Sequence, residues 1–496
     1  MGFTTQIFFF MFLPICLIAY YCALAVEKMG RLGEWFKKIR LKDIVLIVAG
    51  LGFYSWTCFD NIFRLLTYIL LVFIFGQVIA KCRKSDWNLV LAKGNEESKK
   101  YPLRAVVTGV FVAGVVFYLV YSKYWSEVVS IWNWFMNTEI SMHSITAPLA
   151  ISFLTFSAVS YLADISKGKA EAGNLVDCLL YLSFFPKIIS GPTVLWRDFK
   201  VQIADRKPQL SALADGVTRI MIGFAKKVII ADTLGGCVAK VPETGIDIPT
   251  AWISAFLYML QIYFDFAGYS DIAIGLAKLF GFEIKENFNF PYCSTSIGEF
   301  WRRWHISLGT WFREYVYFPL GGSRKGKKAT LRNLGVVFLL TGIWHGNGLN
   351  YLIWGCINGA LVILERIMAG KTIYEKTPKV VKWLGTMAVT LFCWEFFRFG
   401  NLDSVILWLK TALGFVTYQN CHTWKYYFDM QIAVIAIVGF LGSTLFGMKP
   451  IQSGYNRLVS TKTGYAIEHL VLVCLLIIAI MFMISSGYSP FIYFQY

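Results

Sequence analysis

The segment that decides the fold reads Thr341-Gly342-Ile343-Trp344-His345-Gly346-Asn347-Gly348. It ends an apolar run that begins near Asn333, just after the basic stretch 324–332. A helix of that length reaches only roughly 18 Å into a bilayer, and the glycines then break it. The next apolar segment, Leu349–Leu364, is again followed by charged residues. The two segments are therefore predicted to form a hairpin whose tip, with His345, stops inside a membrane.

The composition supports a lipid environment for the whole chain. Of its 496 residues, 57% are hydrophobic and only 16% are charged, whereas a soluble protein is about a quarter charged. The net charge of +17 is typical of Lys and Arg gathered in cytoplasmic loops. Since no nucleic-acid recognition motif accompanies that charge, no nucleic-acid partner is expected. The 11 cysteines are scattered without a C-x-x-C pair, which favours neither disulfides nor a metal site.

Apolar segments of spanning length recur along the chain with short polar breaks between them. This pattern predicts an all-α integral membrane protein, a polytopic helical bundle of roughly eleven to twelve transmembrane helices. Re-entrant and interfacial helices are expected beside them. No long linker or internal repeat interrupts the pattern, so residues 1–496 are predicted to form a single transmembrane domain.

The distribution of Lys and Arg predicts the orientation of the chain in the membrane. The loop Lys28–Lys42 is strongly basic and should be cytoplasmic, which places the N-terminus outside. The basic loop Lys81–Arg104 should return to the cytoplasm. Lys449, Arg457 and Lys462 precede the last helix, so the C-terminal tail is predicted to be extracytoplasmic as well.

His345 is a candidate catalytic residue because ionisable side chains within a membrane are costly and mark functional sites. Irregular backbone at that depth is tolerated only where protein buries it or a wet cavity exposes it. Acyl transfer to a hydroxyl needs a general base near neutral pH, and imidazole suits that role. A purely structural histidine that fixes the hairpin also fits. No G-x-S-x-G motif or metal-spaced cluster offers another mechanism.

His305 lies in a second unusual segment. In a continuous helix, Trp301, His305, Leu308, Phe312 and Tyr315 would share one face. The result would be a basic, aromatic, amphipathic helix suited to the inner membrane interface. In this position His305 could act in catalysis, or it could simply pack against the core and tie the helix to it.

Other polar residues interrupt the apolar runs. Asp265 and Asp271 lie inside a predicted span, where they either pair with basic residues or shape a reaction chamber. Glu395 and Arg398 stand three apart on a predicted helix and are expected to pair. The loop 319–328 is rich in glycine and basic residues, and it suits coenzyme A phosphates and anionic lipid headgroups equally.

Several of these segments together resemble the signature of the membrane-bound O-acyltransferases. They are Phe300–Leu308, Trp311–Tyr315, Gly342–Gly346, Tyr263–Gly275, Glu286–Tyr292 and Phe185–Pro192. The motifs are densest between Pro148 and Arg366. Pro319–Gly322 is similar to the alginate O-acetylation branch of the family, and it is less like the teichoic-acid D-alanylation branch. One departure is Glu314, where many relatives have Asp.

The resemblance implies a central chamber between an inner and an outer funnel. His345 would correspond to the family's invariant intramembrane histidine and act as the base. His305 would correspond to its second polar position. Candidate donor-binding residues are Arg302, Arg303, Trp304, Arg313, Arg324 and Lys325, and candidate polar residues of the chamber are Asp265, Asp271 and Asn287.

The C-terminal helix and tail, residues 466–496, carry a further hypothesis. Ser489–Tyr496 resembles the tail of this branch and that of the small membrane peptide of the D-alanylation system. Tyr493 is therefore a candidate acyl carrier in a covalent relay. An aromatic tail anchored at the membrane interface is the alternative.

The resemblance implies a membrane O-acetyltransferase of the bacterial inner membrane. Acetyl-CoA would be its co-substrate, with no permanently bound cofactor. An extracytoplasmic SGNH-type acetyltransferase would be its partner, and a polysaccharide or peptidoglycan the acceptor. A different donor, such as a D-alanyl carrier protein, remains an alternative. A transporter or flippase is another, but it predicts a two-fold repeat that the sequence lacks.

Overall fold

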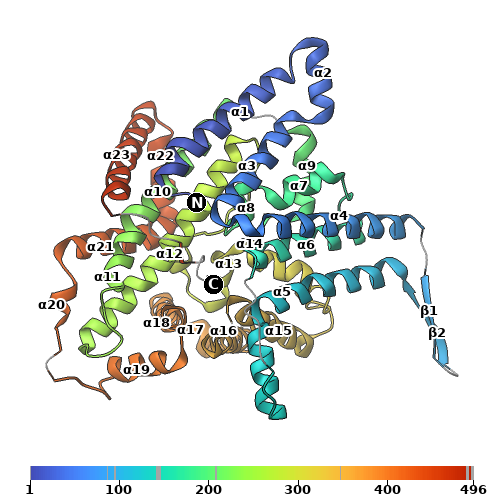
Figure 1. Ribbon diagram of the computed structural model, residues 1–496. Helices are drawn as coiled ribbons and strands as arrows, with labels where there is room; N and C mark the ends of the chain where they lie inside the picture. Colours follow the sequence, from blue (N-terminus) through green and yellow to red (C-terminus); the bar gives the residue numbers. More distant parts are fainter. Residues whose placement is uncertain are drawn as a thin grey trace. The chain divides into compact units, whose positions relative to one another are not determined.

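The computed structural model describes residues 2–85, 88–93, 96–140, 147–206, 209–346, 348–419, 421–486 and 491–492 (Figure 1). The chain divides into two compact units, Met1–Leu213 with Leu276–Ile284 and Ala214–Gly275 with Lys285–Tyr496. Each unit is described by itself below. The expectation of a single domain over residues 1–496 stays a prediction.

The first unit is built mainly from helices. Its elements are η1 Phe8–Phe12, α1 Leu13–Val26, α2 Gly30–Ile39, α3 Leu41–Thr57, η2 Phe59–Asn61, α4 Ile62–Ser85, β1 Asn88–Lys93, β2 Glu96–Pro102, α5 Leu103–Met136, α6 Ile151–Ser166, α7 Leu175–Ser183, α8 Phe185–Ile188 and α9 Trp196–Asp205. The helix α10, Leu210–Ala225, leads into the second unit.

The second unit holds the remaining helices. They are η3 Lys226–Ala231, α11 Asp232–Val238, α12 Ile248–Leu279, η4 Pro291–Cys293, α13 Ile297–Arg303, α14 Ile306–Phe312, η5 Arg313–Tyr317, α15 Lys327–His345, α16 Leu349–Met368, α17 Thr372–Lys376, α18 Lys379–Arg398, α19 Leu402–Ala412, α20 Trp424–Tyr427, α21 Met430–Thr444, η6 Leu445–Gly447, α22 Lys449–Val459 and α23 Lys462–Ser486. The last turn of α12 belongs to the first unit.

Seven helical stretches within the described residues are long and apolar enough to cross a membrane. They are Phe8–Val26, Phe59–Ser85, Leu103–Met136, Leu349–Met368, Lys379–Arg398, Met430–Gly447 and Lys462–Ser485. The predicted helical, multi-pass membrane class is therefore confirmed, while the predicted orientation stays a prediction. Seven is fewer than the expected eleven to twelve because several apolar helices, such as α3 and α6, are short.

A short hairpin interrupts the helical pattern. The strands β1 and β2 pair antiparallel, with Asn88 opposite Pro102 and Lys93 opposite Glu96 (Figure 1). They occupy the segment that the sequence predicted as a basic loop. The hairpin joins α4 to α5, so two of the seven candidate spans are connected by a strand pair.

The predicted hairpin around His345 is present as α15 and α16, although α15 begins at Lys327 rather than near Asn333. Two glycines let the helices approach closely. A Cβ atom on Gly342 would lie 2.7 Å from the carbonyl oxygen of Tyr351, and one on Gly355 would lie 2.6 Å from that of Phe338. Since real Cβ atoms do not come so close to backbone, larger residues would force the hairpin apart.

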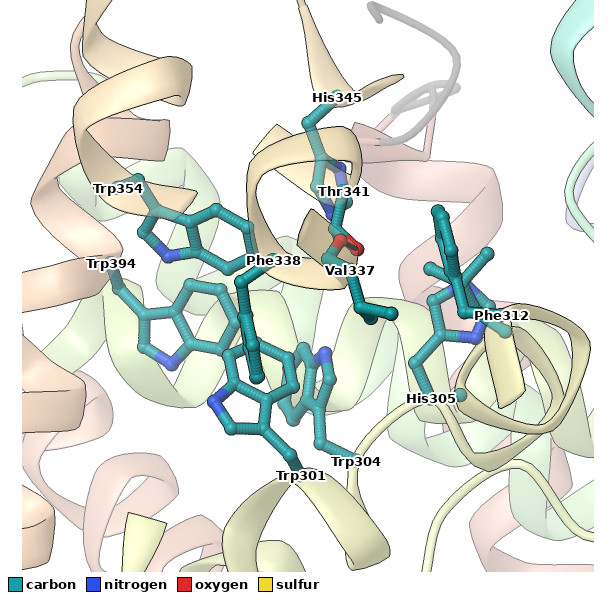
Figure 2. A pocket seen from close by; sticks show the side chains of 12 residues that line it. Trp301, Trp304, His305, Phe312, Val337, Phe338, Thr341, His345, Trp354 and Trp394 are labelled. Atoms are coloured by element: carbon teal, nitrogen blue, oxygen red, sulfur yellow. Dashed lines mark hydrogen bonds between the residues drawn. The ribbon is translucent and has the colours of Figure 1, made fainter. Parts of the chain in front are cut away.

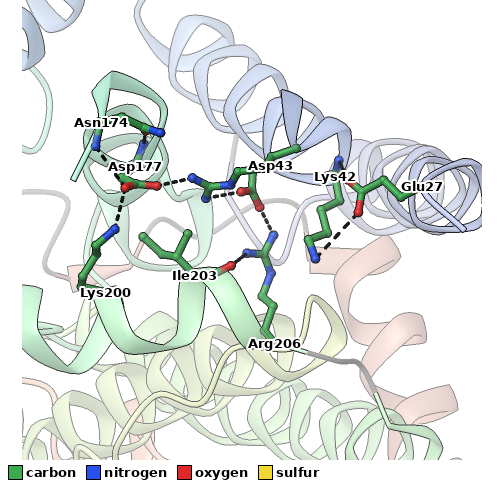
Figure 3. A network of polar contacts seen from close by, with 9 residues as sticks. Glu27, Lys42, Asp43, Asn174, Asp177, Lys200, Ile203 and Arg206 are labelled. Atoms are coloured by element: carbon green, nitrogen blue, oxygen red, sulfur yellow. Dashed lines mark hydrogen bonds and ion pairs between the residues drawn. The ribbon is translucent and has the colours of Figure 1, made fainter. Parts of the chain in front are cut away.

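In the first unit, buried charges tie α3, α7 and α9 together (Figure 3). Asp177 accepts hydrogen bonds from Arg40 and, at 2.6 Å, from Lys200. Arg40 also pairs with Asp43, which Arg206 contacts from the end of α9. Each acid thus has two basic partners, so the cost of burying it is offset.

The carboxylate of Asp177 lies outside the seven candidate spans. Its burial favours the neutral acid, but the hydrogen bonds from Lys200 and Arg40 outweigh this effect and lower the pKa of Asp177. A group with a lowered pKa stabilises the fold above its unfolded-state pKa, and this contribution is lost as the pH falls.

We expect Asp177→Asn to destabilise the protein by about 1–3 kcal/mol, because it leaves two basic side chains without their shared counter-charge. The apparent unfolding temperature in detergent should fall by about 1–3 °C. The difference from the wild type should narrow at acidic pH, where Asp177 itself becomes protonated.

Glu171→Gln is the matched control. Glu171 also pairs with an arginine, Arg83, at 3.3 Å, but its side chain is 73% exposed. Its loss should cost less than about 0.5 kcal/mol. Equal shifts for the two variants would contradict a stabilising role for the buried network.

Candidate active site

His345 is the last residue of α15 and lies at the tip of the α15–α16 hairpin. It is 5% exposed, and its ring packs edge-on against Trp354 at 5.1 Å and Phe397 at 4.9 Å. Gly346, which follows it, has an extended backbone and ends the helix. The hairpin therefore carries His345 at its tip, as the sequence predicted, and the structure shows that this imidazole is buried.

His305 sits in a break between two helices. The predicted continuous helix is wrong here: α13 ends at Arg303 and α14 begins at Ile306. His305 has a φ of +46°, a left-handed conformation that is uncommon for a residue other than glycine. The break turns His305 away from the single face that a helical period would give it.

Asn287 holds this break in place. Its backbone carbonyl accepts a hydrogen bond from the Ile306 N–H at 2.9 Å. Its side-chain Oδ1 accepts from the Ser307 N–H at 3.2 Å and from the Ser307 hydroxyl at 2.8 Å. Its Nδ2 donates to the Ser270 hydroxyl at 3.0 Å. Asn287 thus supplies the hydrogen-bond partners that the first turn of α14 lacks.

The same amide assigns the tautomer of His305. The Nδ1 atom of His305 lies 3.1 Å from Oδ1 of Asn287. Because the Ser307 N–H can only donate, Oδ1 is the acceptor, and Nδ1 of His305 must carry the proton. The lone pair of the imidazole is then on Nε2, which has no hydrogen-bond partner within the described part of the chain.

His305 lies outside the seven candidate spans, but it is buried, with 3% exposure. Phe266 packs against its ring at 4.7 Å. Burial in this apolar setting lowers the pKa of His305 well below its usual range. The imidazole is therefore neutral at pH 7 and can accept a hydrogen bond through Nε2.

The two histidines line one cavity of about 90 Å³. In Figure 2 four tryptophans gather on one side of this cavity, and His305 lies with Phe312 on the other. Its lining residues are Trp301, Trp304, His305, Leu308, Gly309, Phe312, Val337, Phe338, Thr341, His345, Trp354 and Trp394. No carboxylate is among the lining residues in the described part of the chain. The cavity therefore combines two imidazoles with an apolar, aromatic wall.

The tryptophans pack tightly against one another. The rings of Trp304 and Trp394 are 4.6 Å apart, and those of Trp301 and Trp354 are 5.4 Å apart. Sequence reasoning missed Trp354 and Trp394, which come from α16 and α18. Only the tertiary fold brings these helices to α13, and the sequence carries no signal for that contact beyond the abundance of tryptophan.

The basic members of the candidate donor-binding set do not line this cavity. Trp304 forms part of its wall, but Arg303 is held by Glu299 at 2.9 Å and is not a free cation. Burial favours neutral Glu299, yet the Thr295 backbone N–H and Arg303 outweigh that effect and lower the pKa of Glu299. The remaining basic residues of the set are exposed, namely Arg302, Arg313, Arg324 and Lys325.

The acids expected in the chamber serve as partners of basic side chains. Asp271 accepts hydrogen bonds from Arg219 and Lys226, each at 2.7 Å. Asp265 accepts one from Lys227 at 2.6 Å. Neither acid lines the cavity that holds the histidines. The predicted pair of Glu395 with Arg398 is also present, at 3.2 Å.

Asn287 and Tyr493 are the two remaining candidate site residues. Asn287, expected only as a polar residue of the chamber, acts through His305 rather than on the cavity itself. Tyr493, the candidate acyl carrier, lies outside the described residues, which at the C-terminus include only Phe491 and Ile492.

Comparison with known proteins identifies related sequences. A model of the membrane-bound O-acyltransferase family matches residues 115–406. A probable alginate O-acetylase of Pseudomonas putida is 33% identical, over 100% of both chains. A peptidoglycan O-acetyltransferase of Helicobacter pylori is 30% identical over 85% of this chain and 82% of that protein. A teichoic acid D-alanyltransferase of Bacillus subtilis is 30% identical over 69% of this chain and 87% of that protein.

The geometry predicts the protonation of His305 directly. In ¹⁵N NMR of histidine-labelled protein in lipid, His305 should appear as the neutral tautomer with its proton on Nδ1. It should stay neutral from about pH 8 down to pH 5, because a lowered pKa moves protonation to more acidic pH. His305→Gln assigns the signal by removing it.

Asn287→Ala should redistribute the proton between Nδ1 and Nε2, because the acceptor that fixes the tautomer is gone. Ser307→Ala is the control, since it removes one donor to Asn287 but leaves the contact with His305. A wild-type signal with its proton on Nε2, or one that titrates near neutral pH, would contradict the assignment.

Proposed function

The chain belongs to the membrane-bound O-acyltransferase family, and from that premise we propose that it transfers acetyl groups from cytoplasmic acetyl-CoA to an acceptor outside the membrane. The protein is a multi-pass membrane enzyme of the O-acyltransferase class. The proposal concerns the acyl group, its donor and its route.

One observation carries the proposal, namely that two imidazoles from separate elements line one small aromatic cavity. His345 is assigned the proton transfer. It takes the proton of the acceptor hydroxyl as the oxygen attacks the thioester carbonyl, and it returns the proton to the departing thiolate. His305 is assigned orientation, because its neutral ring offers Nε2 as a hydrogen-bond acceptor.

The size and polarity of the cavity favour a small uncharged acyl group. A volume of about 90 Å³ has room for about three water-sized groups, which suits acetyl. A D-alanyl group carries an ammonium ion, and no carboxylate among the lining residues would neutralise it. The relative in Bacillus subtilis keeps D-alanyl transfer as the second candidate.

The proposed acceptor and the proposed external transfer step rest on the functions of similar proteins. Proteins similar to this chain include a probable alginate O-acetylase and a peptidoglycan O-acetyltransferase, so we propose an extracytoplasmic glycan as the final acceptor. The enzyme would lie in the bacterial inner membrane with both termini outside. Tyr493 would accept the acetyl group as a phenyl ester, and an external SGNH-type transferase would pass it on to the glycan.

Four exposed basic residues are candidates for attracting the donor. Arg302 and Arg313 stand on the α13–η5 segment, while Arg324 and Lys325 lie in the glycine-rich loop before α15. All four are exposed cations. We propose that they attract the phosphates of the donor, which carry several negative charges.

The test uses protein reconstituted in liposomes with acetyl-CoA labelled on its acetyl group. Free coenzyme A and label on the protein are measured. We expect His345→Ala to lower coenzyme A release by about 10²- to 10⁴-fold, the usual contribution of a general base. His305→Ala should lower it as well, and His305→Gln, which offers an amide acceptor, should retain more activity than His305→Ala.

His469→Ala is the matched control, because His469 is a half-buried histidine on α23 that does not line the cavity, and the variant should leave turnover unchanged. Tyr493→Phe should abolish label on the protein if the tail carries the acetyl group. Label that persists in Tyr493→Phe would remove the relay and keep the enzyme. Turnover with a D-alanyl carrier protein but not with acetyl-CoA would replace the proposed donor.

A further inference from the structure

One turn of α12 touches two different parts of the second unit. Asp265 and Tyr269, four residues apart, contact the C-terminal segment. Phe266 and Ser270, also four apart, contact the His305 region directly or through Asn287. Residues four apart lie on the same side of a helix, so α12 carries two adjacent stripes with different contacts.

The first stripe holds the C-terminal segment. The backbone N–H of Ile492 donates a hydrogen bond to Oδ2 of Asp265 at 2.9 Å. The ring of Phe491 meets that of Tyr269 edge-on at 4.4 Å. Phe491 is 1% exposed and Ile492 is 8% exposed. These two residues are therefore packed into the protein, 227 positions away in sequence from the acid that binds them.

Lys227 fixes the acid that receives this segment. Its Nζ atom lies 2.6 Å from Oδ1 of Asp265 and 2.6 Å from Oδ1 of Asp232. The same Nζ atom lies 4.5 Å from the centre of the Phe491 ring. Lys227 therefore binds Asp265 through Oδ1, and the other carboxylate oxygen, Oδ2, accepts the backbone N–H of Ile492.

Such a buried ion pair is a poor device for stability alone, since desolvation offsets most of its attraction. Here the ion pair gives the backbone N–H of Ile492 a charged acceptor in Asp265. Hydrogen bonds to charged acceptors are stronger than those to neutral acceptors. A main-chain contact fixes the path of the segment whatever its side chains are.

The second stripe of α12 contacts His305 and its partner Asn287. Phe266 lies 4.7 Å from the ring of His305. Ser270 accepts a hydrogen bond from Asn287, which in turn contacts His305. The C-terminal segment and His305 are thus positioned from neighbouring sides of one rigid helical turn.

We infer that Asp265, held by Lys227, is a docking site for the chain's own C-terminal segment. Docking at Asp265 fixes the position of that segment relative to His305. Asp265 is a positioning residue rather than a catalytic one. The consequence for acyl transfer rests on the proposed function: docking Phe491 and Ile492 fixes the two residues that directly precede Tyr493 in the chain.

Carboxypeptidase digestion of the full-length protein in detergent tests the docking without any assay of activity. Mass spectrometry follows the loss of C-terminal residues. In the wild type, trimming should stop before Ile492, because the docked segment is inaccessible. In Asp265→Asn, which lacks the charged acceptor, trimming past Ile492 should be about tenfold faster or more.

Asp271→Asn is the matched control. Asp271 is a buried acid on the same helix, and it also has two basic partners. It is not one of the residues that form the proposed docking site. It should be trimmed like the wild type. Phe491→Ala changes only the tail and should also speed trimming, so the idea can be tested even where Asp265→Asn fails to fold. Wild-type trimming in both Asp265→Asn and Phe491→Ala would overturn the docking site.

The transfer assay then separates positioning from general damage. Asp265→Asn should lower kcat while leaving KM for acetyl-CoA unchanged, because the donor site is not altered. An equal change in both constants would overturn the positioning role. Faster trimming in Asp265→Asn without any wild-type turnover would uphold the docking site and count against the proposed function instead.

Discussion

The side-chain amide of Asn287 is the contact on which the candidate active site depends. Its one oxygen faces the Ser307 N–H, the Ser307 hydroxyl and the Nδ1 atom of His305. The break between α13 and α14 is held by these bonds, and so is the tautomer of His305. A hydrophobic residue at this position would leave a buried N–H and a buried imidazole without partners, a cost of several kcal/mol in total. The geometry of the cavity therefore begins with an amide that does not line it.

The helix α12 connects this amide to the rest of the second unit. Ser270 receives the Nδ2 donor of Asn287, while Asp265 and Asp271 neutralise three basic side chains from α10 and η3. Polar groups in an otherwise apolar helix are tolerated because each has a partner. Their positions also carry information, since a polar group in an apolar setting fixes one register of packing where apolar contacts alone would allow several.

Features that depend on neighbouring residues in the chain were predictable from the sequence, whereas features that depend on distant contacts were not. The hairpin at His345 was predictable because an apolar run, a glycine stop and a second apolar run are adjacent in the chain. The break at His305 was not, because no Gly or Pro marks it and a helical period fits the residues on both sides. Its cause is Asn287, 18 residues earlier. Arg303 was assigned to the donor although Glu299, four residues before it, was a visible helical partner.

The aromatic wall surrounds the two imidazoles with apolar side chains rather than with water. A thioester that reacts in an open cleft is exposed to hydrolysis, and the acetyl group would be lost before it reached an acceptor. Four tryptophans line the small cavity, and this apolar wall leaves little polar surface to hold water and strengthens each remaining polar interaction. The same apolar setting keeps His305 neutral, since a charged imidazole would be poorly solvated there. Under the proposed function, the wall that limits the acyl group to a small size is therefore also what keeps an orienting imidazole ready to accept a hydrogen bond.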